Sequence, residues 1–302
     1  MSQKLNWMNS SDSKTTKLYF EDGSIKYEGQ ILNNLYEGKG KLYFKNTNGI
    51  LKYEGDFKEG KFNGFGKIYE KDGRLISEGN FINDLPKGFI TFRNGDKFIG
   101  DLSLDYKREG YGILLSFSKN FFYKGTFKDD NIHGKGILYC DSNLTRISVD
   151  GIWVVNKLDG YGVTYWPNGN KKWEGYLTEE NSKIILNGNC STYLENGYLN
   201  SIAFFTRGKV SGRIRIFKNN FLKYEGEVRQ TDDGNGVYHG FGVIYEDNTD
   251  KILFEGYFQN GKPDGVGTAY YNDYKFYHGG FKFGNSHGKG TLYYPSGNIK
   301  KC

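Results

Sequence analysis

The chain has 302 residues and a composition unlike that of an average globular domain. It holds 43 glycines and only 4 prolines, 17% of its residues are aromatic, and its mean hydropathy is −0.67. This mixture excludes a collagen, a proline-rich disordered chain and a membrane-spanning helix. The formal net charge of +6 is mild for this length, and it permits attraction to anionic lipid or nucleic acid without requiring it.

The first 17 residues, MSQKLNWMNSSDSKTTK, lack the apolar segment of a secretory signal. We expect a disordered tail here, or a cap in which Trp7 and Met8 fold over the first repeat. The three cysteines, Cys140, Cys190 and Cys302, are far apart and form no Cys-x-x-Cys pair. That spacing disfavours a disulfide framework and a zinc site, and it favours a reducing, cytoplasmic compartment.

From about residue 18 to residue 302, one pattern recurs about every 25 residues. A clear copy is KYEGDFKEGKFNGFGKIYEKDG, which begins at Lys52, and other copies begin at Tyr123, Phe254 and Tyr277. Each copy has an aromatic residue two positions before a glycine, then a polar turn, a Gly-x-Gly pair and a second turn. About eleven units fit, with a half-unit from Leu18 in front. Such long-period repetition is typical of stacked repeat architectures.

The spacing inside one unit predicts a β-hairpin. Tyr53, Gly55 and Phe57 are two residues apart and share one face of a strand. Gly64 and Gly66 share a face of the next strand, and a polar turn joins the two strands. Glycine inside a strand marks the close approach of another group, and we expect an aromatic ring of the neighbouring strand to lie over it.

Ten glycines are therefore expected to be structural. They are Gly29, Gly55, Gly64, Gly66, Gly134, Gly136, Gly265, Gly267, Gly288 and Gly290. Because one hairpin cannot bury its apolar face alone, the hairpins must stack. We predict an all-β fold: an elongated, twisted, single-layer antiparallel sheet of about eleven hairpins that fills residues 18–302.

Several units depart from the pattern. Pro86 stands at the first glycine of one Gly-x-Gly pair, leaving Gly88, and Cys190 takes a second-glycine position. Ser201 replaces an aromatic residue, and Ile214 replaces the second glycine of the same unit. Residues 230–237, QTDDGNGV, lengthen the next hairpin. We therefore expect the array to be irregular around residues 180–240.

The pattern Tyr-x-Gly followed by Gly-x-Gly and a turn glycine resembles the MORN repeat (membrane occupation and recognition nexus). The units at Tyr53, Phe254 and Tyr277 match it at almost every position. The resemblance implies a single-layer twisted sheet with a groove. It also implies a scaffold or linker role, since members of the family occur in cytoskeletal, ciliary and cell-cortex assemblies and at membranes. Some members contact phospholipids, some self-associate, and in others the repeats regulate a catalytic domain.

No arrangement of residues predicts catalysis, a metal or a cofactor. Carboxylates recur at one position of the unit, at Glu28, Glu54, Glu78, Glu174, Glu225 and Glu255, and a catalytic pair would not be copied in this way. They are better interpreted as a solvated or cross-strand-paired row.

His133, His239 and His287 recur at one turn position, too far apart to share a metal ion. The glycine-rich stretches open no helix, which disfavours a nucleotide site. Packing over glycine accounts for the aromatics, so nucleic acid is not an expected partner.

The preferred function is a non-enzymatic scaffold that binds extended or helical protein segments along an aromatic-lined groove. The candidate groove residues are the first-strand aromatics Tyr53, Phe98, Tyr123, Trp173, Tyr224, Phe254 and Tyr277. A homodimer through the repeat ends is a further expectation. Two alternatives stay open: a membrane-apposed tether with weak affinity for anionic phospholipid, and a regulatory subunit of an enzyme held on another chain. By the resemblance, the expected location is the cytoplasm, at the cytoskeleton, a cilium or the membrane cortex.

Overall fold

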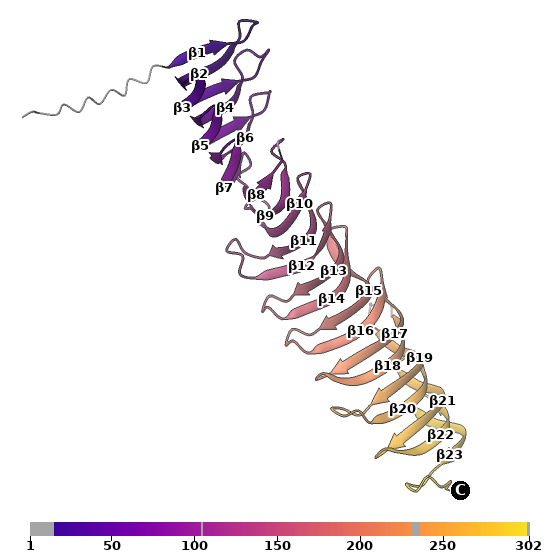
Figure 1. Cartoon of the computed structure of the whole chain (residues 1–302). Coiled ribbons are helices and arrows are strands. Elements are labelled where there is room, and N and C mark those ends of the chain that lie inside the picture. The colour runs from indigo at the N-terminus through magenta and orange to yellow at the C-terminus, as the bar shows by residue number, and fades with distance from the viewer. Residues whose placement is uncertain (1–14, 104, 231–235, 301–302) are drawn as a thin grey trace, which may run out of the picture. The chain divides into compact units, whose positions relative to one another are not determined.

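The computed structural model describes residues 15–103, 105–230 and 236–300, and the elements in these ranges are β-strands (Figure 1). The expected N-terminal cap, Trp7 and Met8 included, and most of the insertion at 230–237 lie outside the described residues. The first strand begins at Thr16, two residues before the predicted start of the array. The described residues form twenty-three strands, this first one included, which is the number required by one leading strand and eleven two-stranded repeats.

The chain divides into two compact units, residues 1–131 with 141–143, and residues 132–140 with 144–302. The strands of the first unit are β1 (Thr16–Tyr19), β2 (Ile25–Leu32), β3 (Leu35–Tyr43), β4 (Leu51–Lys58), β5 (Lys61–Tyr69), β6 (Leu75–Ile82), β7 (Leu85–Phe92), β8 (Lys97–Leu102), β9 (Arg108–Ser116) and β10 (Phe121–Lys128).

The strands of the second unit are β11 (Asn131–Tyr139), β12 (Ile147–Val154), β13 (Lys157–Tyr165), β14 (Lys171–Glu180), β15 (Lys183–Tyr193), β16 (Leu199–Thr206), β17 (Lys209–Lys218), β18 (Phe221–Gln230), β19 (Gly236–Tyr245), β20 (Ile252–Gln259), β21 (Lys262–Tyr271), β22 (Tyr274–Lys282) and β23 (Asn285–Leu292).

Within each unit every strand pairs antiparallel with the next one in sequence. The tight turns that join β4 to β5 and β17 to β18 place two consecutive residues at positive φ, Glu59 and Gly60 in the first and Asn219 and Asn220 in the second. This is the geometry of type I′ turns, whose twist matches that of the flanking strands. The predicted all-β antiparallel fold of hairpin repeats is confirmed in both units.

One row of paired glycines crosses the strands. Gly40 pairs with Gly29 on one side and with Gly55 on the other, and Gly55 pairs with Gly66. In the second unit the row includes Gly256, Gly267, Gly279 and Gly290. A Cβ built on Gly66 would overlap the ring of Tyr53, and one on Gly55 would lie 2.6 Å from the Tyr53 hydroxyl oxygen. The ring thus covers glycines of two adjacent strands, as the sequence predicts.

The tyrosine hydroxyl also satisfies a backbone group of its own strand. The β4–β5 register shifts between Gly55 and Phe57, where β5 has extra residues, and the Tyr53 hydroxyl donates at 3.0 Å to the carbonyl oxygen of Asp56, opposite this bulge. The same bond recurs in other repeats: Tyr27 to Gln30 at 2.8 Å, Tyr224 to Glu227 at 2.6 Å and Tyr277 to Gly280 at 3.1 Å. The ring and the bulge therefore stabilise each other, because a buried carbonyl without a donor is costly.

The first glycine of each Gly-x-Gly pair has a different role. Gly64, Gly134, Gly265 and Gly288 have φ of 109°, 82°, 111° and 75°, a region that L-residues rarely adopt. Gly64 lies under the side chain of Asp56, not under an aromatic ring. The pair thus combines a bulge glycine with a glycine covered by a ring, a distinction that the shared spacing does not predict.

Rings of neighbouring repeats close the core. Tyr53 stacks on Phe62 with centroids 3.7 Å apart and planes at 3°, and it meets Phe81 of the next repeat edge-on at 5.6 Å. Tyr224 and Tyr238 stack at 3.8 Å, and Phe258 of the following repeat meets both rings edge-on. Each repeat therefore covers the ring of the one before it, which is why the hairpins must stack.

The structure shows where the departing residues lie in the strand pairing, and it corrects the position expected for Pro86. The glycine row continues through Cys190, Ala203 and Ile214, so pairing is maintained across the described part of 180–230. Pro86, however, pairs with Phe81 as Phe62 pairs with Phe57. Pro86 therefore occupies the ring-stacking position, and not the position of the first glycine.

The same register shows that the second glycine of that repeat is the one replaced. Glu78 pairs with Thr91, so Ile90 has the place in β7 that Gly66 has in β5. Here Ser77 stands at the tyrosine position, and both Ser77 and Ile90 are buried. Ser201 and Ile214 repeat this exchange in the second unit. In both repeats a serine replaces the tyrosine, and an isoleucine replaces the glycine that the tyrosine ring would cover. The two changes together preserve the volume of the core.

Gly66→Ala should destabilise the chain by about 2–3 kcal/mol, because the added methyl group overlaps the Tyr53 ring and neither backbone nor ring has room to move. The matched control is Cys190→Ala, at a position of the same row that already holds a side chain. It should cost about 1 kcal/mol or less. Urea unfolding measures both, and equal costs would show that no ring confines the glycine.

Ser77→Tyr and Ile90→Gly should each destabilise the first unit, the former by overpacking and the latter by about 3–5 kcal/mol through a cavity. The double variant recreates the Tyr53–Gly66 arrangement. It should recover at least about 2 kcal/mol relative to the sum of the single variants. Additive losses in the urea-unfolding cycle would contradict the proposed exchange of volume.

Candidate interaction surface

The aromatics expected to line a groove lie in the core. Tyr53, Phe98, Tyr123 and Tyr224 are 0% exposed, Phe254 is 6% and Tyr277 is 9%, and Trp173 is half-buried. Burial raises the pKa of Tyr27, at the equivalent position of the preceding repeat, to about 12. The six buried rings are not available to a partner, and five of them, those of Tyr53, Phe98, Tyr224, Phe254 and Tyr277, cover glycines. The expectation that they anchor one is therefore corrected, and an interaction surface has to be sought on the opposite face.

We call the opposite side of each unit's sheet the outer face. It presents the residues on either side of the glycine row, whose side chains point away from the rings. One row on this face holds the recurring carboxylates. They pair with lysines on adjacent strands: Glu28 with Lys17 at 3.2 Å, Glu54 with Lys41 at 3.3 Å and Glu78 with Lys67 at 3.5 Å. The interpretation of this row as cross-strand pairs is confirmed for these residues.

Tyrosines at the ends of the second strands support the carboxylate row. The Tyr43 hydroxyl donates to Glu28 at 3.3 Å, and Tyr193 donates to Glu174 at 2.7 Å. Burial and the neighbouring Glu28 carboxylate raise the pKa of Tyr43. Hydrogen bonds from Tyr193 and Lys171 lower the pKa of Glu174. These hydrogen bonds favour the ionised form of the Glu174 carboxylate.

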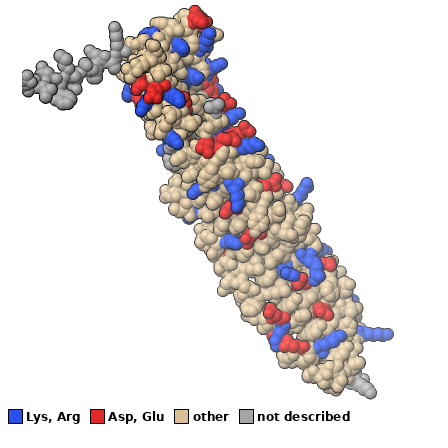
Figure 2. Space-filling view, in the orientation of Figure 1, with Lys and Arg blue, Asp and Glu red and all other residues tan. Residues whose placement is uncertain are grey.

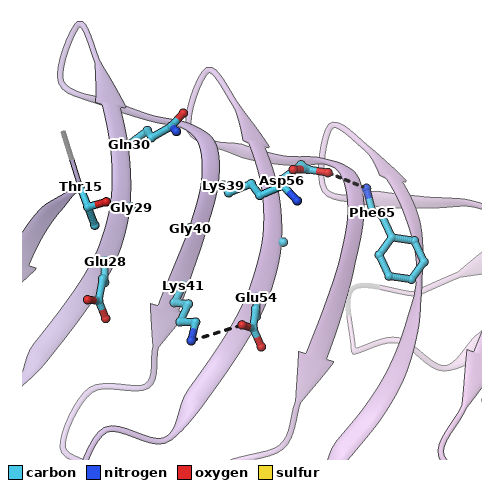
Figure 3. Close-up of a pocket in the computed structure, with 11 residues that line it drawn as sticks. Thr15, Glu28, Gly29, Gln30, Lys39, Gly40, Lys41, Glu54, Asp56 and Phe65 are labelled. Atoms are coloured by element: carbon cyan, nitrogen blue, oxygen red, sulfur yellow. Dashed lines mark hydrogen bonds and ion pairs between the residues drawn. The ribbon is translucent and has the colours of Figure 1, made fainter. Parts of the chain in front are cut away.

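In the first unit the outer face is hollowed over β2, β3 and β4 (Figure 3). The hollow measures about 580 Å³, and its floor is the backbone of Gly29, Gly40 and Gly55. Its walls are polar: Lys41 pairs with Glu54, and the Phe65 backbone N–H donates to Asp56 at 3.2 Å. The Lys41 and Glu54 charges of this hollow are thus already paired within the chain.

In the second unit, aromatic side chains replace polar ones beside the glycine row. Tyr161, Tyr176, Phe241 and Tyr257 are 52%, 57%, 39% and 54% exposed. Tyr161 meets Tyr176 at a centroid distance of 6.3 Å, and Phe241 meets Tyr257 at 5.7 Å, both edge-on. Phe204 of β16, 49% exposed, lies in the same row. We call these five residues the outer aromatic row.

Sequence reasoning missed this row, although a signal was present. Tyr161 and Phe241 are the middle residues of Gly-x-Gly triplets. Because successive residues of a strand face opposite sides of the sheet, their side chains must lie on the face opposite the core rings. Tyr176 and Tyr257 directly follow the glycines that pair with those triplets. Exposed aromatics in a row are uncommon on a surface that meets only water.

Other candidate groups show no shared site. The His278 Nδ1 atom lies 3.0 Å from the Thr268 hydroxyl oxygen across the sheet. Among the described residues, no three histidine, cysteine or acidic side chains gather closely enough to hold a metal ion. Within the same ranges no helix is long and apolar enough to cross a membrane. Figure 2 shows acidic and basic side chains interspersed, without a large area of one sign on the face in view.

The MORN repeat family model matches six segments of the chain, residues 27–48, 53–73, 123–145, 150–171, 254–275 and 277–299. The chain is a MORN-repeat protein. Its family and its all-β repeat architecture are thus as the sequence predicts. MORN repeats are consistent with a scaffold that meets proteins or membrane lipids, and proteins that carry them are often associated with membranes or the cytoskeleton.

No curated protein matches this MORN-repeat chain. Among solved structures it is similar to a chain in the structure titled "Crystal Structure of TcdB2-TccC3 without hypervariable C-terminal region", with 11% identity and a TM-score of 0.16. The match covers 87% of this chain and 18% of that one. A likeness this low supports no argument about fold or function.

Lys41→Met should change the free energy of unfolding by about 1 kcal/mol or less, because the ion pair with Glu54 is exposed and screened by water and salt. Urea unfolding at low and high salt measures this. A loss of several kcal/mol would show that the carboxylate row stabilises the fold and is not free to vary for binding.

Proposed function

We propose that this MORN-repeat protein is a non-enzymatic scaffold that holds other proteins on its outer face. The observation that carries the proposal is the outer aromatic row. Large rings that are 39–57% exposed and lie side by side on a rigid sheet suit the buried centre of a protein interface. Binding would bury these rings at little conformational cost, because each is fixed on paired strands.

A binding role also fits the carboxylates better than catalysis does. Glu28, Glu54 and Glu78 repeat one arrangement with one lysine each, and a reaction site needs groups that converge at a single place. By the association common in the family, we place the scaffold in a cytoskeletal, ciliary or cell-cortex assembly in the cytoplasm.

The test is affinity isolation of the tagged full-length protein from its own cells, with cross-linking and mass spectrometry. The variant Tyr161→Ser/Tyr176→Ser should have the same β-sheet circular dichroism as the wild type. The amount of at least one specific partner recovered with it should fall at least about tenfold. The matched control is Tyr271→Ser/Phe283→Asn, which removes two exposed rings, 59% and 68% exposed, near turns instead of in the row.

Two outcomes would contradict the proposal. One is a partner set that is unchanged in the outer-row variant. The other is recovery of membrane lipid with no specific protein, together with binding of the purified chain to anionic vesicles at physiological salt, which would support the lipid-tether alternative.

A further inference from the structure

The carboxylate row loses its internal lysine at two places in the second unit. In the first unit Lys41 lies between Glu28 and Glu54 on the adjacent strands. At the equivalent place in β13, Val163 lies between Asp150 and Glu174. In β19, Val243 lies between Glu225 and Glu255. The sheet thus keeps both carboxylates on either side of a position from which the cation has been removed.

One carboxylate at each place then has no cationic partner. Glu174 pairs with Lys171 at 3.0 Å, and Glu225 pairs with Arg215 at 3.5 Å. Asp150 and Glu255 have no lysine, arginine or histidine nitrogen within 4.0 Å in the described part of the chain. Both are half-buried, and Glu255 also hydrogen-bonds with the Tyr270 hydroxyl, which brings no positive charge.

Aromatic rings lie beside the carboxylate row at both places, next to Glu174 at the first and next to Glu255 at the second. Tyr161 is two residues before Val163 on the same face of β13, and Tyr176 is two residues after Glu174 on β14. Phe241 and Tyr257 have the same relation to Val243 and Glu255. In the first unit β5 also has a ring at this position, Phe65, but Lys67 follows it and supplies the cation from within the chain.

We propose that each of these two places binds an arginine or lysine side chain from an extended basic segment of a partner protein. We call them the Val163 site (Asp150, Tyr161, Val163, Glu174, Tyr176) and the Val243 site (Glu225, Phe241, Val243, Glu255, Tyr257). A guanidinium or ammonium group would lie against the ring faces and the unpaired carboxylate, taking the place of the missing lysine. The inference deepens the proposed scaffold function and rests on it.

The charge of the sites selects this occupant. Each site has one carboxylate in excess over its cations, so it attracts a basic side chain and repels phosphate. An anionic membrane surface is therefore disfavoured at these sites. An apolar helix alone is also disfavoured, because it would bury Asp150 and Glu255 without a counter-charge.

The distance between the sites sets the length of the segment. They are centred on β13 and β19, which are six strand steps apart, or roughly 29 Å at about 4.8 Å per step. An extended chain advances about 3.3 Å per residue, so two basic residues roughly eight or nine positions apart would reach both sites at once. Phe204 of β16 lies between the sites and offers the middle of the segment an exposed ring.

The experiment is selection from a phage-displayed library of random peptides of about sixteen residues, a length that spans both sites. The target is the full chain. It is compared with the variant Val163→Lys/Val243→Lys, which places a lysine at the two positions equivalent to Lys41 of the first unit. The control is Val163→Thr/Val243→Thr, which keeps a β-branched side chain without adding charge. Equal circular dichroism and urea midpoints confirm that all three proteins are folded.

The wild type and the threonine variant should enrich peptides with two basic residues about eight or nine positions apart. The lysine variant should bind these peptides at least about tenfold more weakly. Its remaining affinity should no longer fall as the salt concentration rises, whereas that of the wild type should. Enrichment of peptides without basic pairs, equal binding to the lysine variant, or no enrichment at all would overturn the inference. If the lysine variant retains cellular partners that cross-link to the outer face, the proposed scaffold function remains supported, but the inference of two sites for basic side chains is contradicted.

Discussion

The structure depends on one contact, an aromatic ring that lies across paired glycines of two adjacent strands. Tyr53 covers Gly55 and Gly66, and its hydroxyl donates to the carbonyl oxygen of Asp56, opposite the bulge in β5. Because the ring occupies the space of two absent side chains, a register slip of one residue would drive it into a Cβ atom. The contact therefore fixes register, bulge and burial together, and repeating it along the chain produces a stack of hairpins.

That contact also decides which surface is free for binding. The rings are closed in by phenylalanines of the next repeat, such as Phe81 over Tyr53, so the core face has little to offer a partner. The outer face is not constrained by this packing and can vary in chemistry. It carries paired charges around Glu28 and Glu54 in the first unit and exposed rings around Tyr161 and Phe241 in the second. A common frame with a variable face is what a scaffold with selective partners requires.

Much of the fold could be predicted because strand spacing places residues on faces. Tyr53, Gly55 and Phe57 share a face by period alone, and the carboxylates must then point the other way. Period alone does not show that Gly64 needs a left-handed φ while Gly66 needs an absent Cβ, since both look alike in sequence. Pro86 was misplaced for the same reason: only the pairing with Phe81 reveals which repeat position it occupies. The sequence also does not show which face carries the interaction surface. First-strand aromatics such as Tyr53 are large enough to bind a partner, but rings of the next repeat bury them.

The measurement that tests this account most directly is a tyrosinate absorbance titration, with circular dichroism followed in parallel. Burial raises the pKa of Tyr27 to about 12, and those of Tyr53, Tyr123 and Tyr224 further, from the ordinary value of 10.0. A pKa raised on folding gives stability that is complete below the unfolded-state pKa and is lost as the pH rises through the folded-state pKa. The account predicts that these buried tyrosines ionise only as the β-sheet signal is lost. Ionisation of all the tyrosines near pH 10 with the β-sheet signal intact would contradict it.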